Sequence, residues 1–199
     1  MSYFDEGYYL QTKLAQLINS GEASPGGGSW TMQKLNAALE ASGLSPYDHY
    51  LMYGRDEHLN PNPYFNEYEY LAAKTKQLNA TAENNPYGDR AWTTADTLRA
   101  IQASGLNPAE HYEMFGAYET DNNGNFINPS NAFDANAYYS AKLLQTRQRG
   151  AEINGKTGND ITLQDMLEIM QDSGLSPVEH YMGYGAGEAS DDGIPMVQT

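Results

Sequence analysis

The sequence predicts an all-α protein made of three tandem copies of one unit of about 61–68 residues, each with three short helices. The first observation behind this prediction is a nine-residue motif that occurs three times. It reads SGLSPYDHY at 42–50, SGLNPAEHY at 104–112 and SGLSPVEHY at 173–181. The second observation is the helical spacing of apolar residues before each motif, with no competing strand pattern.

A second recurring motif, Phe followed five residues later by Tyr, sets the boundaries of the copies. The pairs are Phe4 and Tyr9, Phe65 and Tyr70, and Phe133 and Tyr138, at intervals of 61 and 68 residues. Two ordered motifs in three copies are hard to obtain by chance. We therefore divide the chain into three helical repeats, named the first, second and third segments: 3–63, 64–131 and 132–199.

The first helix of each segment is predicted to begin directly after the Phe. The residue there is an Asp or Asn, whose side chain accepts backbone N–H groups at a helix N-terminus: Asp5, Asn66 and Asp134. The Phe before this cap and the Tyr four residues after it match a hydrophobic staple. A loop rich in Gly, Pro and Asn follows, and turns are expected there.

The second helix is predicted to begin after a Thr N-cap and to end at a Gly. The caps are Thr31, Thr93 and Thr162. The terminating glycines suit the left-handed conformation that ends many helices: Gly43, Gly105 and Gly174. The third helix starts at once with Ser or Asn, then Pro, then an acid three residues after the cap, the pattern of a capping box. It is predicted to end at Gly54, Gly116 and Gly185.

Composition excludes several classes of protein. The chain has 26 Asp and Glu against 11 Lys and Arg, and the net charge of −15 repels nucleic acid phosphates and anionic membranes. This charge favours divalent cations or basic partners, although it also keeps a protein soluble. Without cysteine, disulfides, thiolate metal sites and a Cys nucleophile are excluded. No run approaches the roughly 20 apolar residues of a membrane helix, so no membrane insertion is expected.

His and Lys recur at fixed places in the segments, and both patterns favour structure over catalysis. His49, His111 and His180 could be bases or ligands, but a catalytic site is needed once and a packing role in every copy. No catalytic motif is recognisable, so no enzyme activity is expected. Three of the lysines stand at one position: Lys13, Lys74 and Lys142. A structural ion pair is expected with the acids that follow the third helix: Glu57, Glu119 and Glu188.

The loops after the third helix are the candidate metal sites. Calcium takes six to eight oxygens from carboxylates, amides and backbone carbonyls. The second segment supplies alternating oxygen side chains, a partial echo of an EF-hand loop without its final bidentate Glu: Glu119, Asp121, Asn123 and Asn125. Further candidate ligands lie in the other segments: Asp56, Glu57, Glu188, Asp191 and Asp192. An ordinary Asn-Gly turn with solvated acids is the competing interpretation.

The order of motifs within a segment resembles a repeat of large bacterial exported proteins. In the first segment the match comprises Phe4-Asp5, Tyr8-Tyr9-Leu10, Gly43-Leu44-Ser45-Pro46, His49-Tyr50, Tyr53-Gly54, Glu57 and Asn60-Pro61. Such proteins are adhesin-like or RTX-type, calcium-associated and secreted without a cleaved N-terminal signal, so the resemblance implies calcium and export. The third segment departs from the pattern, with Ile194-Pro195 in place of Asn-Pro. The glycine-rich nonapeptide repeats of RTX domains are absent from the sequence.

These observations predict an extracellular structural or interaction module, such as an adhesin or surface-layer segment, that is stabilised or assembled by calcium. Its expected partners are further copies of itself, other surface proteins or a glycan. Its expected location is secreted or cell surface, although no signal peptide is visible in the first ten residues, MSYFDEGYYL. The alternative is a glycan- or peptide-binding module, because Tyr-rich loops suit polar ligands.

Overall fold

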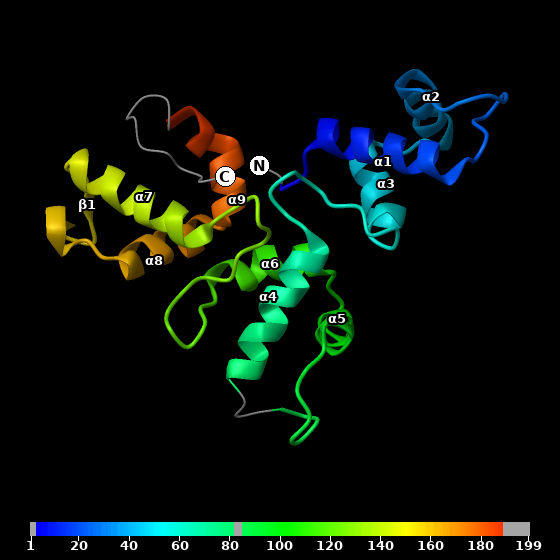
Figure 1. Ribbon diagram of the computed structural model, residues 1–199. Coiled ribbons are helices and arrows are strands. Elements are labelled where there is room, and N and C mark those ends of the chain that lie inside the picture. The colour runs from blue at the N-terminus through cyan, green and yellow to red at the C-terminus, as the bar shows by residue number, and fades with distance from the viewer. Residues whose placement is uncertain (1–2, 82–84, 189–199) are drawn as a thin grey trace. The chain divides into compact units, whose positions relative to one another are not determined.

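The computed structural model describes residues 3–81 and 85–188, and its regular elements there are helices and one two-stranded hairpin (Figure 1). The all-α class predicted from the sequence is confirmed in this general form, with the hairpin as an addition. The chain divides into two compact units, an N-terminal unit at Ser2–Pro63 and a C-terminal unit that contains Tyr64–Thr199. The first segment lies in the N-terminal unit, and the other two segments share the C-terminal unit.

The N-terminal unit is organised around an aromatic core. Its helices are α1 (Glu6–Ser20), α2 (Met32–Ser42), α3 (Pro46–His49) and the π-helical turn η1 (Tyr50–Gly54). Helix α1 packs against both α2 and α3. Tyr9 on α1 and Tyr50 on η1 are buried, and their rings meet edge to face at 5.6 Å, a favourable geometry for aromatic pairs.

The C-terminal unit contains two groups of helices. They are α4 (Glu67–Ala80), α5 (Thr94–Ala103) and α6 (Pro108–Met114), then α7 (Ala135–Gln148), α8 (Leu163–Ser173) and α9 (Pro177–His180). Short helical turns follow or precede them: η2 (Gly116–Tyr118), η3 (Gly158–Asp160) and η4 (Tyr181–Gly185). Helix α4 packs against α5 and α6, and α7 packs against α8 and α9.

Aromatic and polar contacts join the second and third segments within this unit. Phe126 stacks on Tyr139 with ring centroids 4.2 Å apart, and its backbone N–H donates to the Asn136 Oδ1 at 2.8 Å. Tyr64 meets Tyr181 edge to face at 5.1 Å. Since Tyr139 is fully buried, this contact is part of the core of the unit and not a loose junction.

The caps predicted from the sequence stand at the helix ends. Side chains that accept a backbone N–H at a helix start belong to Asp5, Asn66 and Asp134, to Thr31, Thr93 and Thr162, and to Ser45, Asn107 and Ser176. Left-handed φ values end the second helices: +73° at Gly43, +83° at Gly105 and +67° at Gly174. These predictions are confirmed because capping signals act over three or four residues.

We expect Gly105→Val to lower the free energy of unfolding by more than about 1 kcal/mol, because a β-branched residue resists a positive φ. A Cβ at this position would meet no atom within 4 Å, so backbone conformation and not space determines the loss. Chemical denaturation measures it. The control is Gly105→Asn, which should lose less, since Asn tolerates the left-handed region. A Val variant as stable as the wild type would contradict the assignment.

The end of the third helix differs from the prediction. The π-helical turns η1 and η4 do end at Gly54 and Gly185, but the prediction is wrong for Gly116, because α6 already ends at Met114. After Gly54 the backbone also stays right-handed, with φ −63° at Arg55. These glycines therefore do not serve as left-handed helix stops, and their role is a close packing contact described below.

The hairpin in the third segment was not predicted. Strands β1 (Glu152–Ile153) and β2 (Lys156–Thr157) pair antiparallel across Asn154 and Gly155. Both turn residues have positive φ, 50° and 76°, as a two-residue type I′ turn requires. The Asn-Gly pair between apolar and β-prone residues is the signal that could have revealed it.

Candidate functional site

Each segment contains a buried Tyr whose hydroxyl meets the His of the nine-residue motif. The Oη and Nδ1 atoms are 2.8 Å apart for Tyr9 and His49, 2.7 Å for Tyr70 and His111, and 2.6 Å for Tyr138 and His180. The glycine a few residues after this His, which is Gly54, Gly116 or Gly185, lies against the same Tyr. A Cβ on Gly54 would stand 2.6 Å from the Tyr9 Oη, which is closer than real Cβ contacts. Gly is needed here because the buried ring occupies the space of a side chain.

The Tyr and His of these pairs are both uncharged at neutral pH. Burial lowers the pKa of the three histidines below the ordinary 6.5, and the ammonium of the nearby Lys lowers it further. Burial also raises the pKa of Tyr9, Tyr70 and Tyr138. The hydrogen bond to Tyr occupies one imidazole nitrogen of each His, as a packing role requires.

A buried Lys ammonium is neutralised in each segment, and the ion pairs predicted from the sequence are confirmed. The Nζ to carboxylate distances are 2.7 Å for Lys13 and Glu57, 2.5 Å for Lys74 and Glu119, and 2.7 Å for Lys142 and Glu188. The same ammonium groups donate to amide oxygens one turn later, on Gln16, Gln77 and Gln145. A buried charge with two acceptors escapes most of the desolvation penalty. The Lys-x-x-Gln spacing in the sequence could have revealed these glutamines.

The predicted calcium loop of the second segment is folded on itself. The carboxylate of Asp121 accepts the backbone N–H of Asn123 at 2.8 Å and of Asn125 at 3.0 Å, and the side-chain amide of Asn125 at 3.2 Å. These bonds, led by the one from Asn125, lower the pKa of Asp121. The Asp121 N–H donates in turn to the Asn125 carbonyl at 2.8 Å. Glu119 does not join this loop, because it pairs with Lys74.

The remaining predicted ligands are dispersed. Glu57 and Glu188 pair with lysines, Asp56 is exposed in a turn, and Asp191 and Asp192 lie outside the described residues. Over residues 3–81 and 85–188, no three His, Asp or Glu side chains form a group that could hold a metal ion. Calcium at 119–125 would therefore rely on one carboxylate, backbone carbonyls and water, as expected of a weak site. Calcium binding at this loop stays a prediction.

Calcium titration of the double variant Asp121→Ala/Asn123→Ala tests this loop. We expect the wild type to release or absorb heat at millimolar calcium and the variant to bind more weakly, because its carboxylate and one amide oxygen are lost. The variant should also lose calcium-dependent thermal stabilisation. Asp172→Ala, on the exposed face of α8, is the control. Equal affinity in both proteins would show that this loop is not the calcium site. No heat in the wild type would count against calcium binding by the chain altogether.

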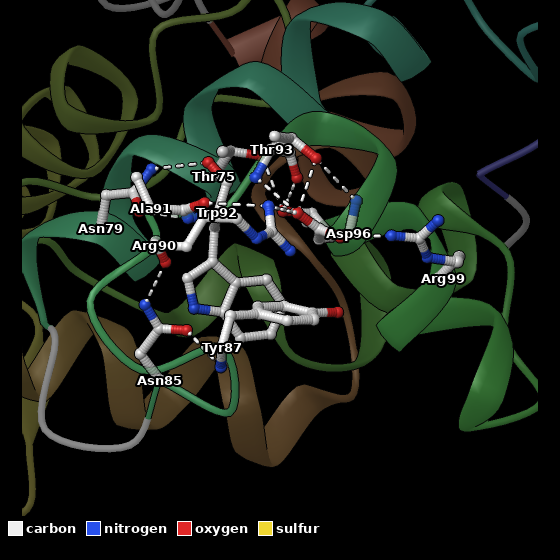
Figure 2. A network of polar contacts seen from close by, with 11 residues as sticks. Thr75, Asn79, Asn85, Tyr87, Arg90, Ala91, Trp92, Thr93, Asp96 and Arg99 are labelled. Atoms are coloured by element: carbon white, nitrogen blue, oxygen red, sulfur yellow. Dashed lines mark hydrogen bonds and ion pairs between the residues drawn. The ribbon is translucent and has the colours of Figure 1, made fainter.

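A polar network that the sequence reading did not identify fixes the loop before α5 (Figure 2). Its centre is Asp96, 1% exposed, which accepts the Thr93 N–H and pairs with Arg90 at 2.7 Å and with Arg99. The Arg90 hydrogen bond and those from Thr93 hold the pKa of Asp96 well below its usual range. The Arg90 guanidinium also lies 4.2 Å from the centre of the Tyr87 ring. The Thr-x-x-Asp spacing is a capping box that could have revealed this network.

Side-chain amides tie the same loop at both ends. Asn79 on α4 donates to the Trp92 carbonyl at 3.0 Å and accepts the Trp92 N–H at 2.7 Å. Asn85 donates to the Arg90 carbonyl at 2.7 Å. Tyr87 and Trp92 meet edge to face at 5.2 Å, and Tyr87 remains 37% exposed. The loop thus presents an aromatic ring in a fixed position.

One aromatic position is exposed in all three segments. It directly precedes Gly54, Gly116 or Gly185 and holds Tyr53, Phe115 and Tyr184, which are 47%, 49% and 47% exposed. Each ring lies against the His of its own segment, at centroid distances of 5.2, 5.7 and 5.2 Å. Met52 and Met114 beside two of them are more than half exposed. Each segment therefore exposes an aromatic ring next to the His whose Nδ1 meets the buried Tyr.

No family model, curated protein or solved structure matches this chain. Each helix in the part of the chain that the structure describes is too short or too polar to cross a lipid bilayer.

Proposed function

We propose that this chain is an extracellular, non-catalytic structural or interaction module, built from three copies of one helical unit. One observation carries the proposal. The recurring polar residues (Tyr with His, and Lys with Glu and Gln) are used in contacts inside their own segments, whereas the recurring aromatic residue before the glycine is exposed. About half of each ring stays exposed even after it has packed on the His of its own segment, and binding of a partner would explain this recurring exposed surface.

The chemistry of the exposed position suits a protein contact. Aromatic residues and Met are enriched in the buried centres of interfaces, and Tyr53 with Met52 and Phe115 with Met114 form two such pairs. The ring of each aromatic is supported by the neighbouring His, so little side-chain entropy is lost when a partner covers it.

Net charge defines the conditions under which copies associate. Chains with a charge of −15 repel one another, and added cations reduce this repulsion. Calcium, which the sequence resemblance implies, would act in this way even without a dedicated cage of ligands. We therefore expect self-association in calcium to exceed that in sodium at the same ionic strength.

Light scattering with size-exclusion chromatography tests the proposal on the triple variant Tyr53→Ser/Phe115→Ser/Tyr184→Ser. The mass of the wild type is expected to rise with protein concentration in calcium, whereas the variant stays monomeric because the apolar contact is lost. Circular dichroism should show equal helicity in both. Tyr87→Ser, which removes an exposed Tyr elsewhere, is the control. A wild type that is monomeric in every condition, or a variant that associates equally, would contradict the proposal.

A second candidate function, glycan or peptide binding, is favoured by the fixed loop of Figure 2. Tyr87 is presented there with Arg90 against one ring face, and the hydrogen bonds of Asn79 and Asn85 hold the loop in shape. Aromatic rings and polar groups held in this way suit polar ligands with apolar faces.

A further inference from the structure

The second segment carries an insertion between two fixed points. In the first segment Asn60-Pro61 follows the Lys-bound Glu57 after three residues, whereas in the second Asn128-Pro129 follows Glu119 after nine. The prolines are anchored alike. The Pro61 carbonyl accepts the Asp5 N–H at 2.8 Å, and the Pro129 carbonyl accepts the Asn66 N–H at 3.1 Å. The six additional residues are therefore not needed to close the segment.

The insertion is ordered and pinned to α4. Gln77 donates to the Thr120 carbonyl at 2.9 Å, and Asn122 donates to the Ala80 carbonyl at 2.7 Å. The Asp121 hydrogen bonds described above hold its tip, and Phe126 is fixed by its stack on Tyr139. Insertions in repeated units are common places for binding sites, because they tolerate variation more than the repeated helices do.

A hollow of about 280 Å³ lies between the insertion and α4. Its apolar lining is formed by Ala73, Ala80, Phe126 and Ile127. Its polar lining is formed by Lys76, Gln77, Asp121, Asn122, Asn123 and Asn128. The volume is slightly below that of most small-molecule sites, which span about 300–1,000 Å³, and suits a single ring.

Several polar groups of this lining are not used by the fold. Over the described residues, Lys76 makes no ion pair or hydrogen bond. Asn122 uses only its amide nitrogen, and Asn128 uses only its Oδ1, which accepts the Ala135 N–H at 3.0 Å. The Lys76 ammonium, the Asn122 Oδ1 and the Asn128 amide nitrogen are thus available to a ligand in the hollow.

We propose that this hollow binds one ring of a saccharide. Adjacent hydroxyls match the amide groups of Asn122, Asn123 and Asn128 and the ammonium of Lys76, and the C–H face of the ring matches the apolar surface of Ala73 and Ala80. A phosphate is disfavoured by the Asp121 carboxylate. The inference concerns a different site from the loop of Figure 2 and does not depend on the exposed aromatic position.

The test is an NMR titration of the full chain with glucose, galactose, mannose and N-acetylglucosamine, each in EDTA. At least one sugar is expected to shift the amide signals of 121–128 and of α4, with millimolar affinity as suits a single ring with few contacts. Lys76→Ala/Asn123→Ala should weaken this binding at least tenfold, whereas Asn36→Ala, an exposed Asn on α2, should leave it unchanged.

Three outcomes would overturn the inference: no shift with any of the four sugars, shifts confined to other residues, or equal affinity in the double variant. Shifts that appear with calcium alone and not with sugar would assign the insertion to the metal. None of these results changes the light-scattering experiment on the exposed aromatic residues, so the failure of either proposal is recognised separately.

Discussion

Replacing Gly116 with Ala is expected to lower the free energy of unfolding of the C-terminal unit by about 3 kcal/mol or more. A Cβ at this position would overlap the Tyr70 Oη and stand 2.9 Å from the Tyr70 Cζ. Tyr70 is fully buried and packs against Tyr112, so its ring has no free space to move into. The added methyl group therefore also breaks the 2.7 Å hydrogen bond to His111.

Urea denaturation measures this loss, and two variants serve as controls. Gly7→Ala adds a methyl group on the exposed side of α1, 3.5 Å from the Asp5 carboxylate, and should be neutral or stabilising. Tyr70→Phe removes the oxygen that the new methyl group would overlap. In the Gly116→Ala protein, Tyr70→Phe should therefore lower the free energy of unfolding by less than it does in the wild type. Additive effects of the two substitutions, or a Gly116→Ala protein of wild-type stability, would show that the close contact is not decisive.

The features predicted from the sequence are those that local chemistry controls. Asp5 accepts a hydrogen bond from a residue only three positions away, and Gly43 adopts its left-handed φ at the helix end it terminates. Such signals need no knowledge of the fold. The pairing of Lys74 with Glu119 spans 45 residues, and it could be predicted because the same two residue types recur at the same places in each segment.

Features whose partners do not recur at fixed sequence positions escaped prediction for the same reason. Asp96 pairs with Arg90 and Arg99, and the equivalent Asp165 of the third segment pairs with Lys156. These cations stand at different distances from the Asp in the sequence, so their meeting depends on the path of each loop. The oxygen-rich residues around Asp121 predicted a metal site, but which of their oxygens are already used in hydrogen bonds depends on the folded turn. The hollow beside α4 needs two elements that are separated by about 40 residues.

Glu113 also has no acidic counterpart in the other segments. We expect it to make the stability of the C-terminal unit fall as pH rises. Its Oε2 is buried without a hydrogen-bond partner among the described residues. The pKa of Glu113 is raised from 4.5 to about 8. Burial is the main cause, and the negative charge of Glu179 adds to it, whereas a hydrogen bond from Ser176 acts in the opposite direction. The equivalent positions in the other segments hold the apolar Leu51 and Met182.

The sign of the effect follows from proton linkage. Between pH 4.5 and about 8 the folded protein holds a proton on Glu113 that the unfolded chain has released. Raising the pH through this window therefore favours unfolding, by up to about 1.4 kcal/mol per pH unit. Above pH 8 the Glu113 carboxylate is charged but still buried. Its neighbours Tyr112, Tyr118 and Glu179 carry no positive charge that could stabilise it.

We expect Glu113→Gln to remove this dependence and Glu113→Leu to make the unit more stable than the wild type at pH 8, by several kcal/mol. The measurement is urea denaturation at pH 5, 6, 7 and 8, and only the difference between variant and wild type is interpreted, because other groups titrate in both. Glu40→Gln on the exposed side of α2 is the control and should follow the wild type. Curves for Glu113→Gln and wild type that run parallel over the whole range would show that Glu113 carries no proton in the folded protein.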